Sequence, residues 1–100
     1  MIHVLAIITA KPQQRASVLK IFNANLPAVH AEAGCIEYAA VVDVAGAKPA
    51  FGPDTFVVVE KWSSPAALAA HAAAPHMLAF GEQTKDLIAN RAVHVLEPAS

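Results

Sequence analysis

The side chains best suited to proton chemistry lie in two short segments of the chain. In the first, Glu60 and Trp62 are two residues apart, so in a strand they share one face. Burial of a glutamate on an otherwise apolar face would raise its pKa, and Glu60 could then act as a base or a hydrogen-bond anchor. If the strand instead curves away from the core, Glu60 lies at a solvated rim.

The second segment contains two histidines on either side of a proline. His71 and His76 flank Pro75, and a spacing of five places them on different faces of a regular helix. The pattern differs from the HExxH motif of zinc enzymes and has no acidic or cysteine ligand nearby in sequence, so we expect no metal site. His76 would open a helix, where it could take a proton from a ligand. Packing or capping is the alternative role for each histidine.

Aromatic and sulfur-containing side chains elsewhere could shape a binding slot. Tyr38 is expected to share a strand face with Ile36 and Ala40, with its hydroxyl either orienting a ligand or reaching water. Met77 and Phe80 are expected on the buried face of the helix that begins near His76. The one cysteine, Cys35, is expected to be a small buried hydrophobe rather than a nucleophile.

The elements that position these side chains follow from the hydrophobic pattern. Runs rich in β-branched residues predict strands over 2–9, 36–43, 55–62 and 92–96. Helical spacing predicts a helix from Gln13 that is kinked or interrupted at Pro27 and followed by Gly34 as its C′ residue. Ser64 and Pro65 predict the start of an alanine-rich helix, which breaks at Pro75 before a last helix over 76–88.

This order of elements is that of a ferredoxin-like split βαβ fold, an α+β arrangement with an antiparallel sheet. The strands over 2–9 and 55–62 are apolar on both faces, yet a ferredoxin-like sheet has helices on one face only, so two helices cannot cover both faces. We therefore expect a homodimer that buries the second face. The space lined by the side chains on the Trp62 side is either a cavity or packed shut.

Composition excludes several classes of function. The chain has 100 residues, enough for one domain, and a net charge of −1, so no basic surface is expected for nucleic acid. A single cysteine excludes an internal disulfide and a CxxC site. The apolar runs are shorter than a membrane span and the N-terminus has no signal-peptide pattern, so a cytoplasmic protein without membrane association is expected.

The segment from Glu60 to Phe80 resembles a known family. Its pattern, E-x-W-x5-L-x2-H-x3-P-H-x3-F, together with E-x-G-C-x2-Y over 32–38, is similar to the antibiotic biosynthesis monooxygenases, and the chain ending at Val95-Leu96-Glu97-Pro98 is similar to their small bacterial quinol monooxygenases. The resemblance spans residues 1–100 as a single domain. It implies a dimeric α+β barrel that oxidises quinols or electron-rich phenols with O2 and without a bound cofactor.

Within that resemblance, the residues expected to act are those already singled out. His76 is predicted to be the proton acceptor, aided by Glu60. The predicted substrate-binding residues are Trp62, Tyr38, His71, Met77 and Phe80.

The chain also departs from particular members of the family. Val58 stands where polyketide-oxidising members have an asparagine, and the first strand lacks the amide side chain of haem-degrading members. Two other functions stay open: a non-catalytic module for small ligands or stress response, and an isomerase of a small phosphorylated metabolite that would use Lys11, Arg15 or Lys61.

Overall fold

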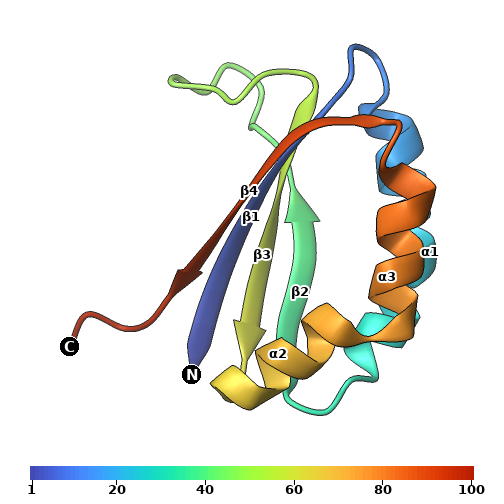
Figure 1. Ribbon diagram of the computed structural model, residues 1–100. Coiled ribbons are helices and arrows are strands. Elements are labelled where there is room, and N and C mark those ends of the chain that lie inside the picture. The colour runs from blue at the N-terminus through green and yellow to red at the C-terminus, as the bar shows by residue number, and fades with distance from the viewer.

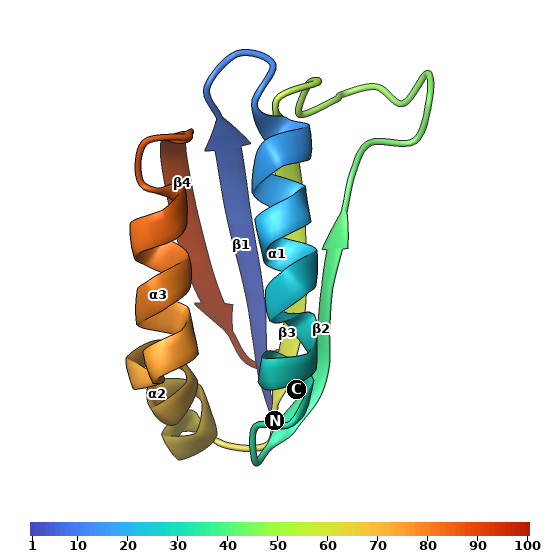
Figure 2. The same cartoon turned by 90° about the vertical axis from the view of Figure 1, so that its right-hand side faces the viewer.

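A four-stranded antiparallel sheet carries all three helices on one of its faces (Figures 1 and 2). The computed structural model describes residues 1–100. Its elements, in chain order, are β1 (Ile2–Ala10), α1 (Arg15–His30), β2 (Cys35–Val41), β3 (Thr55–Trp62), α2 (Pro65–Ala73), α3 (Pro75–Thr84) and β4 (Ile88–Leu96). The strand order is β2-β3-β1-β4. The predicted α+β, ferredoxin-like fold is confirmed.

The core lies between the sheet and the helices. The alternate residues of β1 that face the helices, Val4, Ala6, Ile8 and Ala10, are all buried. On β3 the same face carries Phe56, Val58, Glu60 and Trp62, also buried, so Glu60 and Trp62 share a face as predicted. Helix α1 buries Val18, Phe22 and Val29 against this surface, in agreement with the predicted helical spacing.

Helix α1 differs from its predicted boundaries at both ends. It begins at Arg15, because Gln13 has a positive φ of 67°. It continues through Pro27 to His30, so the proline does not interrupt it. Gly34 is not its C′ residue: the helix is followed by Ala31 in a right-handed conformation, and Gly34, with φ of 85°, forms the turn into β2.

Strand β2 contains a bulge that changes which side chains face the helices. Cys35 pairs with Trp62 and Glu37 pairs with Lys61, so Ile36 is an extra residue without a partner. Ile36 is 52% exposed while Tyr38 is buried. The prediction that Ile36 and Tyr38 share a face is therefore wrong, because one inserted residue reverses the alternation of a strand.

In the C-terminal half, the predicted start of α2 and the predicted break at Pro75 are observed, whereas the end of α3 and the start of β4 differ from the prediction. The Oγ atom of Ser64 accepts a hydrogen bond from the Ala67 N–H at 3.1 Å, which confirms the predicted N-cap of α2. Helix α3 ends at Thr84 rather than 88, and β4 begins at Ile88 rather than 92. Sheet pairing explains the difference, because the Lys11 N–H donates to the Leu87 carbonyl at 2.8 Å and Ile88 already pairs with Ala10.

The face of the sheet opposite the helices is apolar at its centre and uncovered. Leu5 on β1, which is 37% exposed, lies between Val59 and His94 on the neighbouring strands. Ile7 and Val57 continue the apolar area in the next row. His94 is the polar side chain beside Leu5, and the other polar side chains of this face lie toward the ends of the strands: His3, Thr9, Glu37, Thr55, Lys61 and Asn90. None of the helices is long and apolar enough to cross a membrane.

Candidate functional site

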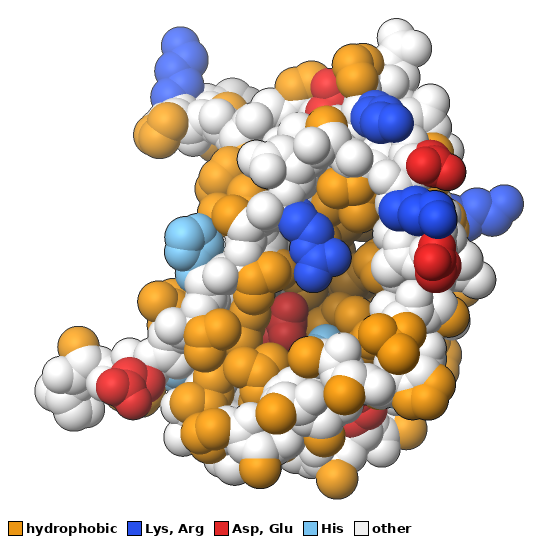
Figure 3. Space-filling view, in the orientation of Figure 1, with side chains coloured by type: hydrophobic (Ala, Val, Ile, Leu, Met, Phe, Trp, Pro, Cys, Tyr) orange, Lys and Arg blue, Asp and Glu red, His pale blue; other side chains and the backbone are white.

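A cavity of about 330 Å³ lies between the sheet and helices α1, α2 and α3. Figure 3 shows it as a hollow whose walls are mostly hydrophobic, with an acidic and a histidine side chain visible inside. Its lining residues are Val4, Ala6, Ile8, Phe22, Tyr38, Val58, Glu60, Leu68, His71, Ala72, Met77, Leu78, Phe80, Gly81, Arg91 and Val93. Twelve of these sixteen are hydrophobic. A pocket of this size and polarity suits a small planar ring.

Glu60 lies on the sheet floor of the cavity and is held by Trp62. The indole Nε1–H of Trp62 donates to Glu60 Oε1 at 2.9 Å, and the glutamate is only 6% exposed. Burial raises the pKa of Glu60, whereas the Trp62 hydrogen bond and nearby His71 act in the opposite direction. The second oxygen, Oε2, has no protein partner and is not among the buried unpaired atoms, so it opens to the cavity.

Tyr38 forms the cavity wall next to Glu60. Its ring stacks on Phe22 with centroids 5.4 Å apart, and Tyr38 pairs with Glu60 across the strands. Burial raises the pKa of the Tyr38 hydroxyl well above its usual range, and the Glu60 carboxylate adds to this effect. The phenol therefore stays neutral and can donate a hydrogen bond to a ligand.

His71 packs on Trp62 and lines the cavity. The His71 and Trp62 ring centroids are 4.5 Å apart, and the Tyr38 ring lies 5.3 Å from His71. The His71 Nδ1 atom is 2.8 Å from Glu32 Oε2. The other ring nitrogen, Nε2, has no protein partner, and the chain has no buried unpaired side-chain nitrogen. It follows that Nε2 faces the cavity as a potential proton acceptor.

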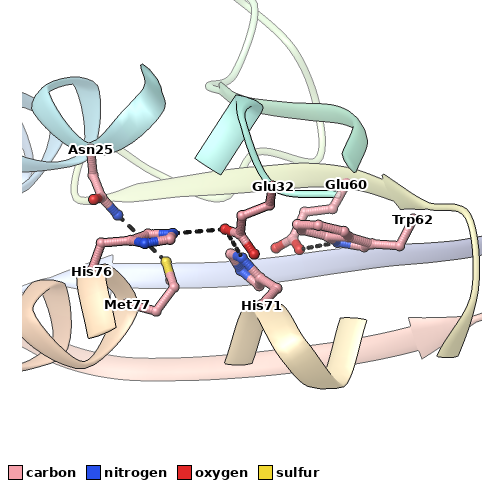
Figure 4. Close-up of polar contacts among 7 residues, drawn as sticks. All are labelled: Asn25, Glu32, Glu60, Trp62, His71, His76 and Met77. Carbon is pink, nitrogen blue, oxygen red and sulfur yellow. Dashed lines mark hydrogen bonds and ion pairs between the residues drawn. The ribbon is translucent and has the colours of Figure 1, made fainter. Parts of the chain in front are cut away.

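The two histidines meet at one carboxylate oxygen (Figure 4). His76 Nε2 also lies 2.8 Å from Glu32 Oε2. The prediction that these histidines lie on different faces of a regular helix fails, because Ala74 is extended with ψ of 140° and α3 starts in a new direction at Pro75. Glu32, in the turn between α1 and β2, is thus a site residue whose role the sequence did not reveal.

Met77 and Phe80 form the helical side of the cavity. The Asn25 side-chain amide donates to Met77 Sδ at 3.4 Å, which ties α3 to α1. The Phe80 ring packs edge-on against Phe22, with centroids 6.3 Å apart. Both residues therefore present apolar surface from positions fixed by packing.

The structure thus gathers all seven predicted site residues, but not all of them line the cavity. Glu60, Tyr38, His71, Met77 and Phe80 line it. Trp62 is fully buried beneath His71, and His76 lies behind Glu32. The role of His76 as proton acceptor stays a prediction, and the geometry favours His71 for the nitrogen that meets a ligand.

One basic side chain completes the cavity wall. Arg91 on β4, opposite Ile8, is the only lysine or arginine in the lining, and nothing in its sequence context beyond its charge pointed to this position. Lys11, Arg15 and Lys61 do not line the cavity: Arg15 donates to the Thr55 carbonyl and Lys61 pairs with Glu37. No group of three or more His, Cys, Asp or Glu residues is arranged to hold a metal ion.

Comparison with known proteins agrees with this fold. A sequence model of the family described as "Antibiotic biosynthesis monooxygenase" matches residues 1–83. The chain is 37% identical over 102 residues to "Probable quinol monooxygenase YgiN" of Escherichia coli (strain K12), with 98% of each chain covered. The crystal structure of PA3566 from Pseudomonas aeruginosa has a TM-score of 0.84 at 26% identity and covers 99% of this chain and 94% of that chain. Rv0793 from Mycobacterium tuberculosis has a TM-score of 0.82 at 27% identity, covering 99% and 95%. The chain belongs to the antibiotic biosynthesis monooxygenase family.

Proposed function

We propose that this chain is a monooxygenase that oxidises a quinol or another electron-rich phenol with O2 and without a bound cofactor. The observation that carries the proposal is the distribution of polar atoms in the cavity. Glu60, Tyr38 and His71 lie next to one another in the cavity lining, while the rest of the lining is mostly hydrophobic. A planar ring would bind with its hydroxyl beside these three side chains and its carbon skeleton against Met77 and Phe80.

The first chemical step is removal of the phenolic proton. His71 Nε2 is the acceptor that faces the cavity, and Glu32 behind it stabilises the imidazolium that forms through the 2.8 Å contact at Nδ1. Neutral Tyr38 can donate its O–H to the phenolate oxygen. Glu60 serves as a second proton site because burial favours its neutral form.

The second step needs no group other than the substrate and O2. The phenolate gives one electron to O2, which leaves a phenoxyl radical and superoxide side by side. The apolar walls exclude water and keep this pair together for the next bond or electron transfer. The name of the Escherichia coli relative, a probable quinol monooxygenase, supports a quinol as the substrate class.

A homodimer and a cytoplasmic location are also part of the proposal. The support for the dimer is the uncovered sheet face, where Leu5, Val41 and Leu96 are between 37% and 46% exposed. An apolar face of this kind is typically covered by a partner. Joining two such faces would produce the dimeric α+β barrel.

Oxygen consumption tests the activity directly. An oxygen electrode is used with a panel of hydroquinones, naphthoquinols and catechols, and the autoxidation rate without protein is subtracted. We expect O2 uptake that is proportional to enzyme concentration and lowered by about 10² to 10⁴ in His71→Ala. Uptake should be unchanged in His30→Gln, an exposed histidine at the end of α1 outside both the cavity lining and the uncovered sheet face. Stabilisation by the same ligands without uptake would instead indicate a binding module.

Anaerobic assays distinguish the proposed oxygenase from the remaining alternative, an isomerase. Conversion of a phosphorylated metabolite in oxygen-free buffer would favour an isomerase over an oxygenase. The structure gives that reading little support, since Arg91 is the only basic residue of the cavity lining.

A further inference from the structure

Glu32, His71 and His76 form a continuous path from the cavity toward solvent. The side chains become more exposed along it, from 7% at His71 to 13% at Glu32 and 28% at His76. Both histidine nitrogens lie 2.8 Å from the same oxygen, Glu32 Oε2, so they are no farther apart than twice that distance. His71 opens to the cavity, whereas His76 is the member with the greatest access to water.

One carboxylate can compensate the charge of one imidazolium. If both rings are protonated, two positive charges share a single negative partner in a partly buried place, where like charges repel more strongly than in water. The most favourable states therefore have one excess proton on either His71 or His76, hydrogen-bonded to Glu32. A proton that arrives on one ring favours departure of the proton from the other.

We propose that His76 is the outlet for the substrate proton: when His71 Nε2 takes the proton from a phenol in the cavity, His76 releases its Nδ1 proton to solvent. This inference rests on the proposed function, because it takes His71 as the acceptor. One proton enters the set of Glu32, His71 and His76, and one proton leaves it. Both hydrogen bonds to Glu32 Oε2 are kept, and no electron is transferred. The substrate then stays an anion while the charge of the three side chains is unchanged.

The other titratable and charged groups near these side chains favour this exchange or leave it unaffected. Burial raises the pKa values of Cys35 and Tyr38, so both stay neutral. The pKa of Glu60 is also raised by burial, which limits its negative charge beside His71. Arg91 is a constant positive charge near Tyr38 and belongs to the cavity wall rather than to the path.

The experiment counts protons during binding of a phenol that O2 does not oxidise. 4-Nitrophenol is the probe, because its anion absorbs visible light and its neutral form does not. Near ~pH 6, where free histidine is partly protonated and the free probe is mostly neutral, two quantities are measured in weakly buffered solution. The absorbance gives the bound phenolate, and a pH electrode gives the protons released per phenolate.

The expected result is phenolate formation in the wild type and in His76→Gln, with a different proton count. The wild type releases up to one proton per bound phenolate, and His76→Gln, which keeps an N–H donor for Glu32 but cannot titrate, releases almost none. His30→Gln is the matched control and behaves as the wild type, because this exposed histidine lies outside the cavity lining and the uncovered sheet face, and the amide can still donate to the Tyr38 carbonyl. Circular dichroism checks that each variant is folded, and His76→Asn replaces His76→Gln if the latter is not.

Three outcomes separate this inference from the proposed function. Phenolate formation with equal proton release in the wild type and His76→Gln overturns the role of His76 and leaves His71 as the acceptor. No proton release by the wild type at any pH from ~5.5 to ~7.5, the range in which histidine titrates, overturns it without any variant. Binding without phenolate formation instead contradicts His71 as acceptor and therefore the first chemical step of the proposed function.

Discussion

At the scale of single residues, the two histidines have different positions relative to the cavity, and this determines their expected roles. His71 Nε2 faces the cavity, while His76 reaches only Glu32. A general base contributes a factor of about 10² to 10⁴ to a rate. We expect His71→Ala to lower the O2-dependent kcat by about that factor, and His76→Ala to lower it less. Steady-state kinetics of both variants, with circular dichroism to check folding, measures the difference.

A larger loss of activity in His76→Ala than in His71→Ala would instead support the sequence-based prediction that His76 is the proton acceptor. If His76→Ala abolishes activity and His71→Ala keeps it, His76 reaches the substrate in a way that this geometry does not show. If neither variant loses activity, the proton goes to water or to Glu60.

Glu60 should make the stability of the fold depend on pH. Its pKa is raised by burial, so the folded state holds the proton more tightly than the unfolded chain, and folding becomes less favourable as the pH rises through the folded pKa. In Glu60→Gln this loss is absent, while the amide oxygen can still accept from the Trp62 N–H. We therefore expect the stability of the variant relative to wild type to increase from acidic to neutral pH.

Urea unfolding at several pH values, followed by Trp62 fluorescence, measures this dependence. A constant difference between the two proteins across the acidic range would show that Glu60 is solvated in the folded state.

The residue patterns of the sequence were sufficient for contacts within one element but not for contacts between elements. Glu60 and Trp62 share a face because a strand alternates its side chains, and their hydrogen bond spans two residues. Glu32 lies 39 residues from His71 and 44 from His76, in a turn without periodicity. Its meeting with both rings depends on how α2 and α3 are placed, which no local pattern specifies.

At the scale of elements, predictions were most accurate where a short stretch of sequence determines the backbone conformation by itself. The run Phe56-Val57-Val58-Val59 and the pair Ser64-Pro65 gave β3 and the start of α2 at the observed residues. The bulge at Ile36 and the early start of β4 were not predicted, because both depend on pairing with a neighbouring strand. Interstrand register is a tertiary property that a single strand sequence does not contain.

Gly34 fixes how closely the turn before β2 approaches the helix that carries His71. A Cβ atom on Gly34 would lie 2.6 Å from Ala67 Cβ and 2.6 Å from Ser63 Oγ, and its φ is +85°. Gly46 has nearly the same φ, +82°, but nothing lies within 4 Å of the added atom. Gly34→Ala and Gly46→Ala therefore share the backbone strain and differ only in the clash with α2.

We expect Gly34→Ala to lose more stability than Gly46→Ala by about 1–3 kcal/mol, the usual cost of overpacking. It should also weaken ligand binding, because displacement of α2 moves His71. Thermal or urea unfolding of both variants gives the difference in stability. Equal losses would mean that α2 moves aside without cost, and the turn would then not position the site.

At the scale of the whole molecule, the helices cover one face of the sheet and leave the other face uncovered (Figure 1). This uncovered face is apolar around Leu5. The cavity lies on the helical side and the proposed dimer interface on the opposite side. β1 contributes Val4, Ala6 and Ile8 to the cavity wall and Leu5 and Ile7 to the uncovered face. Any change in association should therefore be transmitted to the site through the central strand.

Leu5 is the position that best tests the dimer, since it lies in the interior of the uncovered face between Val59 and His94. A specific interface buries roughly 800 Å² on each partner, and an unpaired charge at its centre has a large desolvation cost. We expect wild type to be a dimer and Leu5→Lys to be a folded monomer. Val44→Lys, at a loop residue that is 77% exposed, adds the same charge elsewhere and should remain a dimer.

Sedimentation velocity or light scattering at micromolar concentration measures the mass of each protein, with circular dichroism as the control for folding. A monomeric wild type would contradict the proposed dimer directly, and a dimeric Leu5→Lys would show that the interface lies on another surface. If Leu5→Lys is monomeric and folded, its ligand affinity tests whether the partner supports the cavity. Unchanged affinity would mean that one chain forms the complete site, whereas a loss would mean that β1 keeps its position only when the partner covers it.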